Sequence, residues 1–111
     1  MAHMMMIYLK EEKHLEDILT ALISVDITEA SISEGIHLHN LAAYNIPIFA
    51  GFRDFLIPHK THCKWIHAIV DDKKKIDQLM KELSAIGIDF EKEDIGTLVA
   101  FPLEIMKQKK E

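Results

Sequence analysis

Residues 62–70 read HCKWIHAIV, a short apolar run with the composition and length of a β-strand. Successive side chains of a strand point to opposite faces of the sheet, so this run divides into two sets. One face holds Ile66, Ala68 and Val70, and the other holds Cys63, Trp65, His67 and Ile69. A sheet covered by helices on one side needs only one apolar face. We therefore expect another subunit to cover the second face.

The segments on either side of this strand alternate between strand and helix patterns. Residues 5–10 and 28–38 predict two further strands upstream, and residues 96–103 predict a fourth strand downstream. Apolar residues recur at the spacing of one helical face in residues 14–25 and again in residues 76–86. The order βαββαβ predicts an α+β, ferredoxin-like fold, with a four-stranded antiparallel sheet and two helices on one face.

Local signals mark the ends of the second helix and of the last strand. Asp71 or Asp72 can cap the start of the helix. Gly87 followed by Ile88 predicts a left-handed cap with an apolar contact at its end. Pro102 indicates that the last strand ends at an edge of the sheet or where the chain leaves it.

Residues 35–58, GIHLHNLAAYNIPIFAGFRDFLIP, form a connection of unusual length and composition between two predicted strands. Compact domains rarely contain a structureless loop of roughly 20 residues unless it has a binding role or is disordered. Disordered segments are polar and poor in aromatic residues, unlike this one. We expect the loop to fold over a ligand, a neighbouring subunit or a partner protein.

Length and composition predict one domain in a cytoplasmic, soluble protein. Residues 1–4, MAHM, resemble an expression-vector remnant, residues 5–106 form the predicted domain, and residues 107–111 form a charged tail. The net charge of −5 argues against nucleic acid as a partner. The single cysteine, Cys63, excludes an internal disulfide and suits a reducing compartment.

Four stretches, in their order and spacing, resemble the nitrogen-regulatory PII signalling proteins and their PII-like relatives. The first helix contributes LEDI at 15–18 with Ala21 and Leu22, and the second strand contributes ITEASISEG at 27–35. The strand-to-helix junction IVDD at 69–72 with Ile76, and the last strand GTLVAFPLE at 96–104, complete the set.

The resemblance implies a homotrimer that binds a small-molecule effector, such as a nucleotide, in the clefts between subunits. It also implies that the 35–58 loop reports the ligand state to a target, often a membrane transporter or an enzyme. The sequence departs from the family in residues 89–96, DFEKEDIG, where a glycine-rich phosphate loop is expected and only Gly96 remains. Acidic residues there would repel a polyphosphate, so a different anionic metabolite is an open alternative.

The loop supplies the candidate ligand residues. An arginine in an apolar loop needs a partner, and Arg53 beside Gly51 and Phe52 fits an anion contact as well as it fits a surface ion pair. The predicted ligand-binding residues are Gly35, His37, Gly51, Phe52 and Arg53. Tyr44 and Phe49 are assigned to loop folding or partner contact.

Histidines at both ends of the loop suggest a metal site as the alternative function. Zinc or copper would accept nitrogen and sulfur donors of this kind, and the two ends of a loop meet when its flanking strands pair. The set is His37, His39, His59, His62 and Cys63. The same residues also fit solvated loop histidines and one core cysteine.

No catalytic set stands out in the sequence. Cys63 has His62 beside it, but neighbours on a strand point to opposite faces, so this histidine is not its base. We expect a protein that is not an enzyme.

Overall fold

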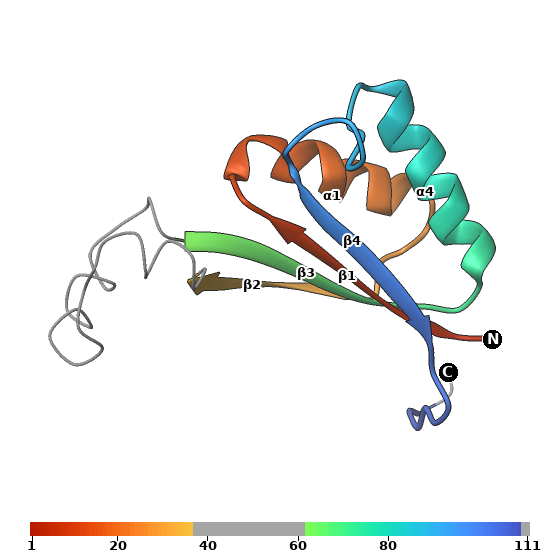
Figure 1. Ribbon diagram of the computed structural model, residues 1–111. Helices are drawn as coiled ribbons and strands as arrows, with labels where there is room; N and C mark the ends of the chain where they lie inside the picture. Colours follow the sequence, from red (N-terminus) through yellow and green to blue (C-terminus); the bar gives the residue numbers. More distant parts are fainter. Residues whose placement is uncertain (37–61, 110–111) are drawn as a thin grey trace, which may run out of the picture.

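The computed structural model describes residues 1–36 and 62–109 of the chain, and it confirms the predicted α+β architecture. The strands are β1 (His3–Leu9), β2 (Ala30–Ile36), β3 (His62–Val70) and β4 (Gly96–Pro102). The helices are the short 3-10 helix η1 (Glu12–His14), α1 (Leu15–Ser24) and α4 (Lys73–Ala85). Figure 1 shows α1 and α4 side by side on one face of the sheet.

The four strands form one antiparallel sheet in the order β2-β3-β1-β4. This order places β2 and β4 at the two edges and leaves β3 and β1 in the centre. The central strands are apolar on the face toward the helices, where they form most of the core. The fully buried strand residues are Met5, Ile7, Leu9, Ile66 and Val70, and α1 and α4 contribute Ile18, Leu22, Leu79 and Leu83.

β1 begins two residues earlier than predicted, because the neighbouring strands β3 and β4 are long enough to pair with these residues. His3 pairs with Val70 of β3 and with Pro102 of β4, so the ladder continues to the first residues of the chain. The backbone carbonyl of Ala2 also accepts a hydrogen bond from the Leu103 amide (2.9 Å).

The predicted cap residues of α4 are confirmed. The Asp72 side chain accepts a hydrogen bond from the Lys74 amide (3.0 Å), which satisfies one free N–H of the first turn. Gly87 has φ of +86°, and the buried Ile88 donates its amide to the Leu83 carbonyl (2.8 Å). This is the hydrogen-bond pattern of a Schellman cap.

α1 ends in the same pattern, with an aspartate where α4 has its glycine. Asp26 has φ of 61°, and Ile27 donates its amide to the Leu22 carbonyl (2.8 Å). Aspartate tolerates this left-handed conformation better than most residues. Lys75 of α4 contacts the Asp26 carbonyl (3.2 Å) and so holds the turn from the second helix.

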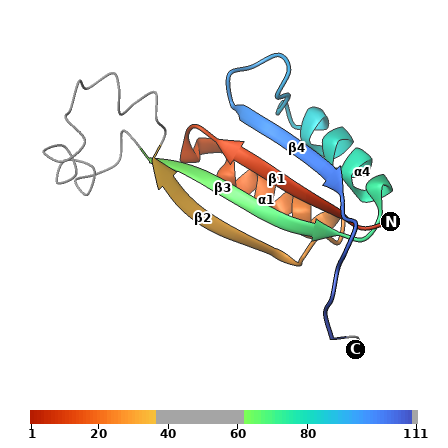
Figure 2. The ribbon, with the colours of Figure 1, turned by 60° about the horizontal axis from the view of Figure 1, so that its bottom comes forward.

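β2 begins at Ala30, two residues after the predicted start, and its side chains are mostly exposed. The last two residues of the predicted strand, 37 and 38, lie outside the described residues. It pairs with β3 so that Ile32 lies opposite Ile66, on the face toward the helices. Ile66 is fully buried, whereas Ile32 is 47% exposed and Ile36 is 46% exposed. The reason is position, because β2 is an edge strand and the two helices cover the centre of the sheet. In Figure 2 β2 lies at the outer edge of the sheet, and α1 lies behind β1 and β3.

Candidate functional site

The face of the sheet opposite the helices, which we call the open face, is built from the alternate residues of each strand (Figure 2). The strand register places Met4, Met6 and Tyr8 of β1 beside Trp65, His67 and Ile69 of β3 and beside Val99 and Phe101 of β4. Val99 is 44% exposed and Phe101 is 47% exposed. The prediction that Trp65, Cys63 and His67 lie on this second face is confirmed.

Aromatic side chains form the centre of the open face. The rings of Tyr8 and Trp65 lie 5.0 Å apart at an angle of 51°, and the Trp65 and His67 rings are stacked with centroids 6.2 Å apart. Aromatic clusters of this kind dominate the energetics of protein interfaces. The open face therefore offers a broad apolar surface with few charges.

Gly35 is the one predicted ligand residue that the structure describes, and it lies at the end of β2 beside this cluster. A Cβ at Gly35 would lie 3.5 Å from the Cys63 sulfur and 3.5 Å from Cδ1 of Trp65, which is an ordinary contact distance. Burial, and then the neighbouring Cys63, raise the pKa of the Tyr8 hydroxyl. The other predicted residues, His37, Gly51, Phe52 and Arg53, lie outside the described residues, as do Tyr44 and Phe49.

The predicted metal set falls mostly outside the described residues. His37, His39 and His59 are among residues 37–61, and only the backbone of His62 is described, as the first residue of β3. Cys63 is described and is a buried free thiol. Across residues 1–36 and 62–109, no group of three or more potential ligands is arranged to hold a metal ion.

Two neighbouring cavities lie at the end of the sheet where β2 begins and β3 ends. They have volumes of about 330 and 300 Å³ and share Glu29 and Ile69 in their walls. The smaller cavity is lined on the open face by Met4, Ser31 and His67. The walls of the larger cavity also include Met106 and Gln108, from residues 103–109 after β4, which we call the C-terminal tail from here on. We call the two together the end pocket.

Ion pairs dominate the charge of the end pocket. Lys75 lies 3.1 Å from a carboxylate oxygen of Asp71 and 3.5 Å from one of Asp26. The hydrogen bond from Lys75 lowers the pKa of the Asp71 carboxyl, and the same contact raises the pKa of Lys75. The Gln108 amide reaches a carboxylate oxygen of Glu29 at 3.5 Å. No local sequence pattern predicts this pocket, because its walls come from distant segments: Gln108 and Glu29 are 79 positions apart in the chain.

Lys75→Met is expected to reduce stability at neutral pH more than at acid pH. The pKa of the Asp71 carboxyl is lower in the folded than in the unfolded chain. The ionised carboxylate therefore stabilises the fold at pH values above its unfolded pKa, and this stabilisation is lost as the pH falls through its folded pKa. The stability difference between wild type and variant should therefore shrink from pH 7 to pH 3. Urea unfolding at both pH values measures it, with Lys73→Met on the same helix as control. An equal difference at both pH values would show that the pair contributes no pH dependence.

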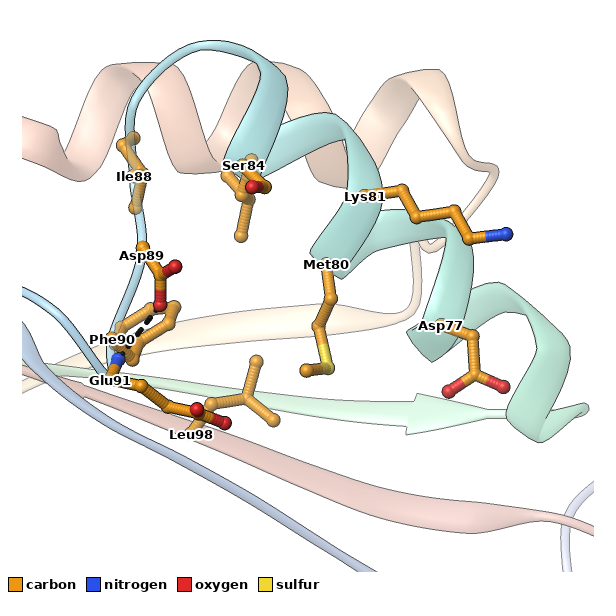
Figure 3. A pocket seen from close by; sticks show the side chains of 10 residues that line it. Asp77, Met80, Lys81, Ser84, Ile88, Asp89, Phe90, Glu91 and Leu98 are labelled. Carbon is orange, nitrogen blue, oxygen red and sulfur yellow. Dashed lines mark hydrogen bonds between the residues drawn. The ribbon is translucent and has the colours of Figure 1, made fainter.

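A groove lies between α4 and β4, on the helix side of the sheet (Figure 3). It has a volume of about 620 Å³, and we call it the α4–β4 groove. Its floor consists of the apolar side chains of Met80, Leu83, Ile88, Phe90 and Leu98. In Figure 3 Met80 extends from α4 toward Leu98, and Asp89 accepts a hydrogen bond from the Glu91 amide (2.9 Å).

Gly96, the remaining glycine of the region where the family's phosphate loop is expected, has a packing role. A Cβ at this position would lie 1.8 Å from the backbone oxygen of Tyr8. Gly96 pairs with Leu9 across the β1–β4 ladder, so the oxygen belongs to the neighbouring strand. The close approach of the two backbones requires glycine here, independently of any ligand.

Comparison with known proteins shows a likeness in structure. No protein-family model matches the sequence, and no curated protein matches it either. A structure of CPII from Thiomonas intermedia K12 bound to ADP, AMP and acetate is similar with a TM-score of 0.59 and 13% identity, over 96% of this chain and 89% of CPII. A second CPII structure, of a nitrogen regulatory PII-like protein bound to ADP, AMP and bicarbonate, has a TM-score of 0.55 and 15% identity, over 90% and 83%.

A third similar structure is the periplasmic divalent cation tolerance protein CutA from Archaeoglobus fulgidus. Its TM-score is 0.55 at 10% identity, over 97% of this chain and 89% of CutA. Identities this low establish the fold. The chain therefore has a ferredoxin-like fold, and within that class it has the fold of the PII-like proteins, as the four sequence stretches predicted.

No helix within residues 1–36 and 62–109 has the length and apolar character needed to cross a membrane.

Proposed function

We propose that this protein is a PII-like regulator that assembles from several copies, in the simplest case three, through its open face. The observation that carries the proposal is the apolar surface around Trp65, on the face of the sheet opposite α1 and α4. Phe101 and Val99 extend this surface to the edge strand, and both are more than two-fifths exposed in the single chain. Large exposed apolar patches mark interaction sites, and a contact between copies is the simplest way to cover a sheet face.

The same assembly would complete a ligand site. Met4, Ser31 and His67 belong both to the open face and to the walls of the end pocket. A copy that covers the open face therefore also closes this cavity. We assign the effector to this boundary between copies, with binding and signalling as the role in place of catalysis. The two CPII structures hold ADP and AMP, so adenine nucleotides are the first candidates, followed by other anionic metabolites.

The 35–58 loop is the proposed link from ligand to target. Gly35 lies at the end of β2 beside Trp65, so the loop begins at the aromatic cluster. The end pocket lies at the opposite end of β2 from the start of the loop, so in this proposal His37, Gly51, Phe52 and Arg53 of a neighbouring copy contact the ligand. Tyr44 and Phe49 contact the target, a transporter or an enzyme. A ligand bound by these residues would change the conformation of the 35–58 loop, and the target would recognise that change.

A thermal-shift experiment tests the ligand assignment. An effector at 100 times its dissociation constant stabilises the folded protein by about 2.7 kcal/mol, which corresponds to a rise in melting temperature of roughly 10 °C. We expect a rise of this size with ADP, AMP or another anionic metabolite, and its loss in Arg53→Ala. Lys60→Ala, the other basic change in this region, is the control and should keep most of the rise. A response that Arg53→Ala leaves intact would contradict the assignment.

A further inference from the structure

The α4–β4 groove combines an apolar floor with a charged rim. Met80 is 46% exposed, so part of the floor is open to solvent. The rim carries three carboxylates, Asp77, Asp89 and Glu91, and one lysine, Lys81. A matching occupant would be an apolar side chain flanked mainly by positive charge.

The C-terminal tail has this character. Ile105 is 75% exposed, the highest value among the large apolar side chains of the described residues apart from Met1. Lys107 and Lys109 follow it, and Glu104 precedes it. The tail therefore presents an acidic residue, an apolar residue and two basic residues in sequence, which complements the single lysine, the apolar floor and the three carboxylates of the groove.

A chain cannot place its own Ile105 in its own groove while the tail keeps its observed contacts. Leu103 is bound to Ala2 beside β1, and Gln108 reaches Glu29 just before β2. β2 and β4 lie at opposite edges of the sheet, so the tail crosses from the β4 edge toward the β2 edge. The groove lies on the β4 side. These contacts hold the tail in place and leave Ile105 exposed.

We infer that Ile105 of one copy docks into the α4–β4 groove of a second copy. Lys107 and Lys109 then lie against the carboxylates of the groove rim, and Glu104 lies near Lys81. This contact goes beyond the proposed function, because it uses the helix side of the edge strand and not the open face. The contact joins neighbouring copies through the same C-terminal tail that lines the end pocket.

Zero-length carbodiimide cross-linking of a mixture of ¹⁴N- and ¹⁵N-labelled protein tests the inference. The reagent joins lysines to carboxylates in direct contact, and mass spectrometry separates links between copies from links within one copy. We expect mixed-isotope links from Lys107 or Lys109 to Asp77, Asp89 or Glu91. Their yield at low protein concentration should fall at least about tenfold in Ile105→Asp and in Met80→Glu, because each change removes the apolar contact.

Ile23→Asp is the matched control, since Ile23 is a 68% exposed isoleucine on α1 outside the groove, and it should leave the links unchanged. Links only within one copy, or mixed links that persist in both groove variants, would overturn the inference. Light scattering on the same samples separates it from the proposed function. An assembly without these links defeats the tail contact alone, whereas a single chain without links defeats both.

Discussion

Gly96→Ala is expected to lower the free energy of unfolding by about 3 kcal/mol, at the upper end of the usual cost of overpacking. The added Cβ would lie 1.8 Å from the Tyr8 oxygen and 2.9 Å from the Tyr8 carbonyl carbon. Both are backbone atoms of β1, so no side-chain rotation relieves the contact. The two strands must move apart, which weakens the β1–β4 ladder next to the core residue Leu9.

Gly35→Ala provides the matched control for this prediction. Its Cβ would meet its nearest neighbours at 3.5 Å, and we expect a change of less than about 0.5 kcal/mol. Urea unfolding of both variants measures the difference. Equal free energies of unfolding for the two variants would contradict the packing role of Gly96. Ligand binding would then be the remaining explanation for a glycine at this position.

Phe101→Glu is expected to break the proposed assembly while the single chain keeps its fold. Phe101 is 47% exposed in the single chain, so its removal costs the core little. In the assembly, the change removes an apolar contact of about 1.5–3 kcal/mol and buries a carboxylate that has no partner. Together these effects should raise the dissociation constant at least about a thousandfold, equivalent to about 4 kcal/mol.

Sedimentation velocity across a dilution series measures this effect, and circular dichroism checks the fold. Ile23→Glu is the control, because Ile23 is an exposed residue of α1, and α1 lies on the face of the sheet opposite the open face. If Phe101→Glu assembles as the wild type does, the open face is not the contact surface.

The sequence predicted the elements of the fold well, because its strongest patterns are local. The two-sided apolar run at 62–70, the Asp72 cap and the Gly87–Ile88 pair each act within a few residues, and all three are confirmed. The exposure of Ile32 was not predicted. It depends on β2 being an edge strand that the helices do not reach, which is a property of the whole sheet.

The candidate site was less predictable than the fold, because it too depends on how distant parts of the chain come together. The end pocket joins Asp26, Lys75 and Gln108, which come from three distant parts of the chain, and no local spacing connects them. The predicted tail comprised only the charged residues 107–111, and the sequence gives no local pattern that connects Ile105, just before it, with the α4–β4 groove. Gly96 was interpreted through the family's phosphate loop, whereas the structure gives it a packing role.

The mass of the wild-type particle in solution tests the central proposal most directly. Light scattering at micromolar concentration should give a multiple of the 12.8 kDa chain mass, with three copies as the expected number. The fluorescence of Trp65, the only tryptophan, should shift to shorter wavelength as assembly covers the open face. A stable particle of 12.8 kDa, with Trp65 emission unchanged on concentration, would contradict the proposal that sister copies cover this face.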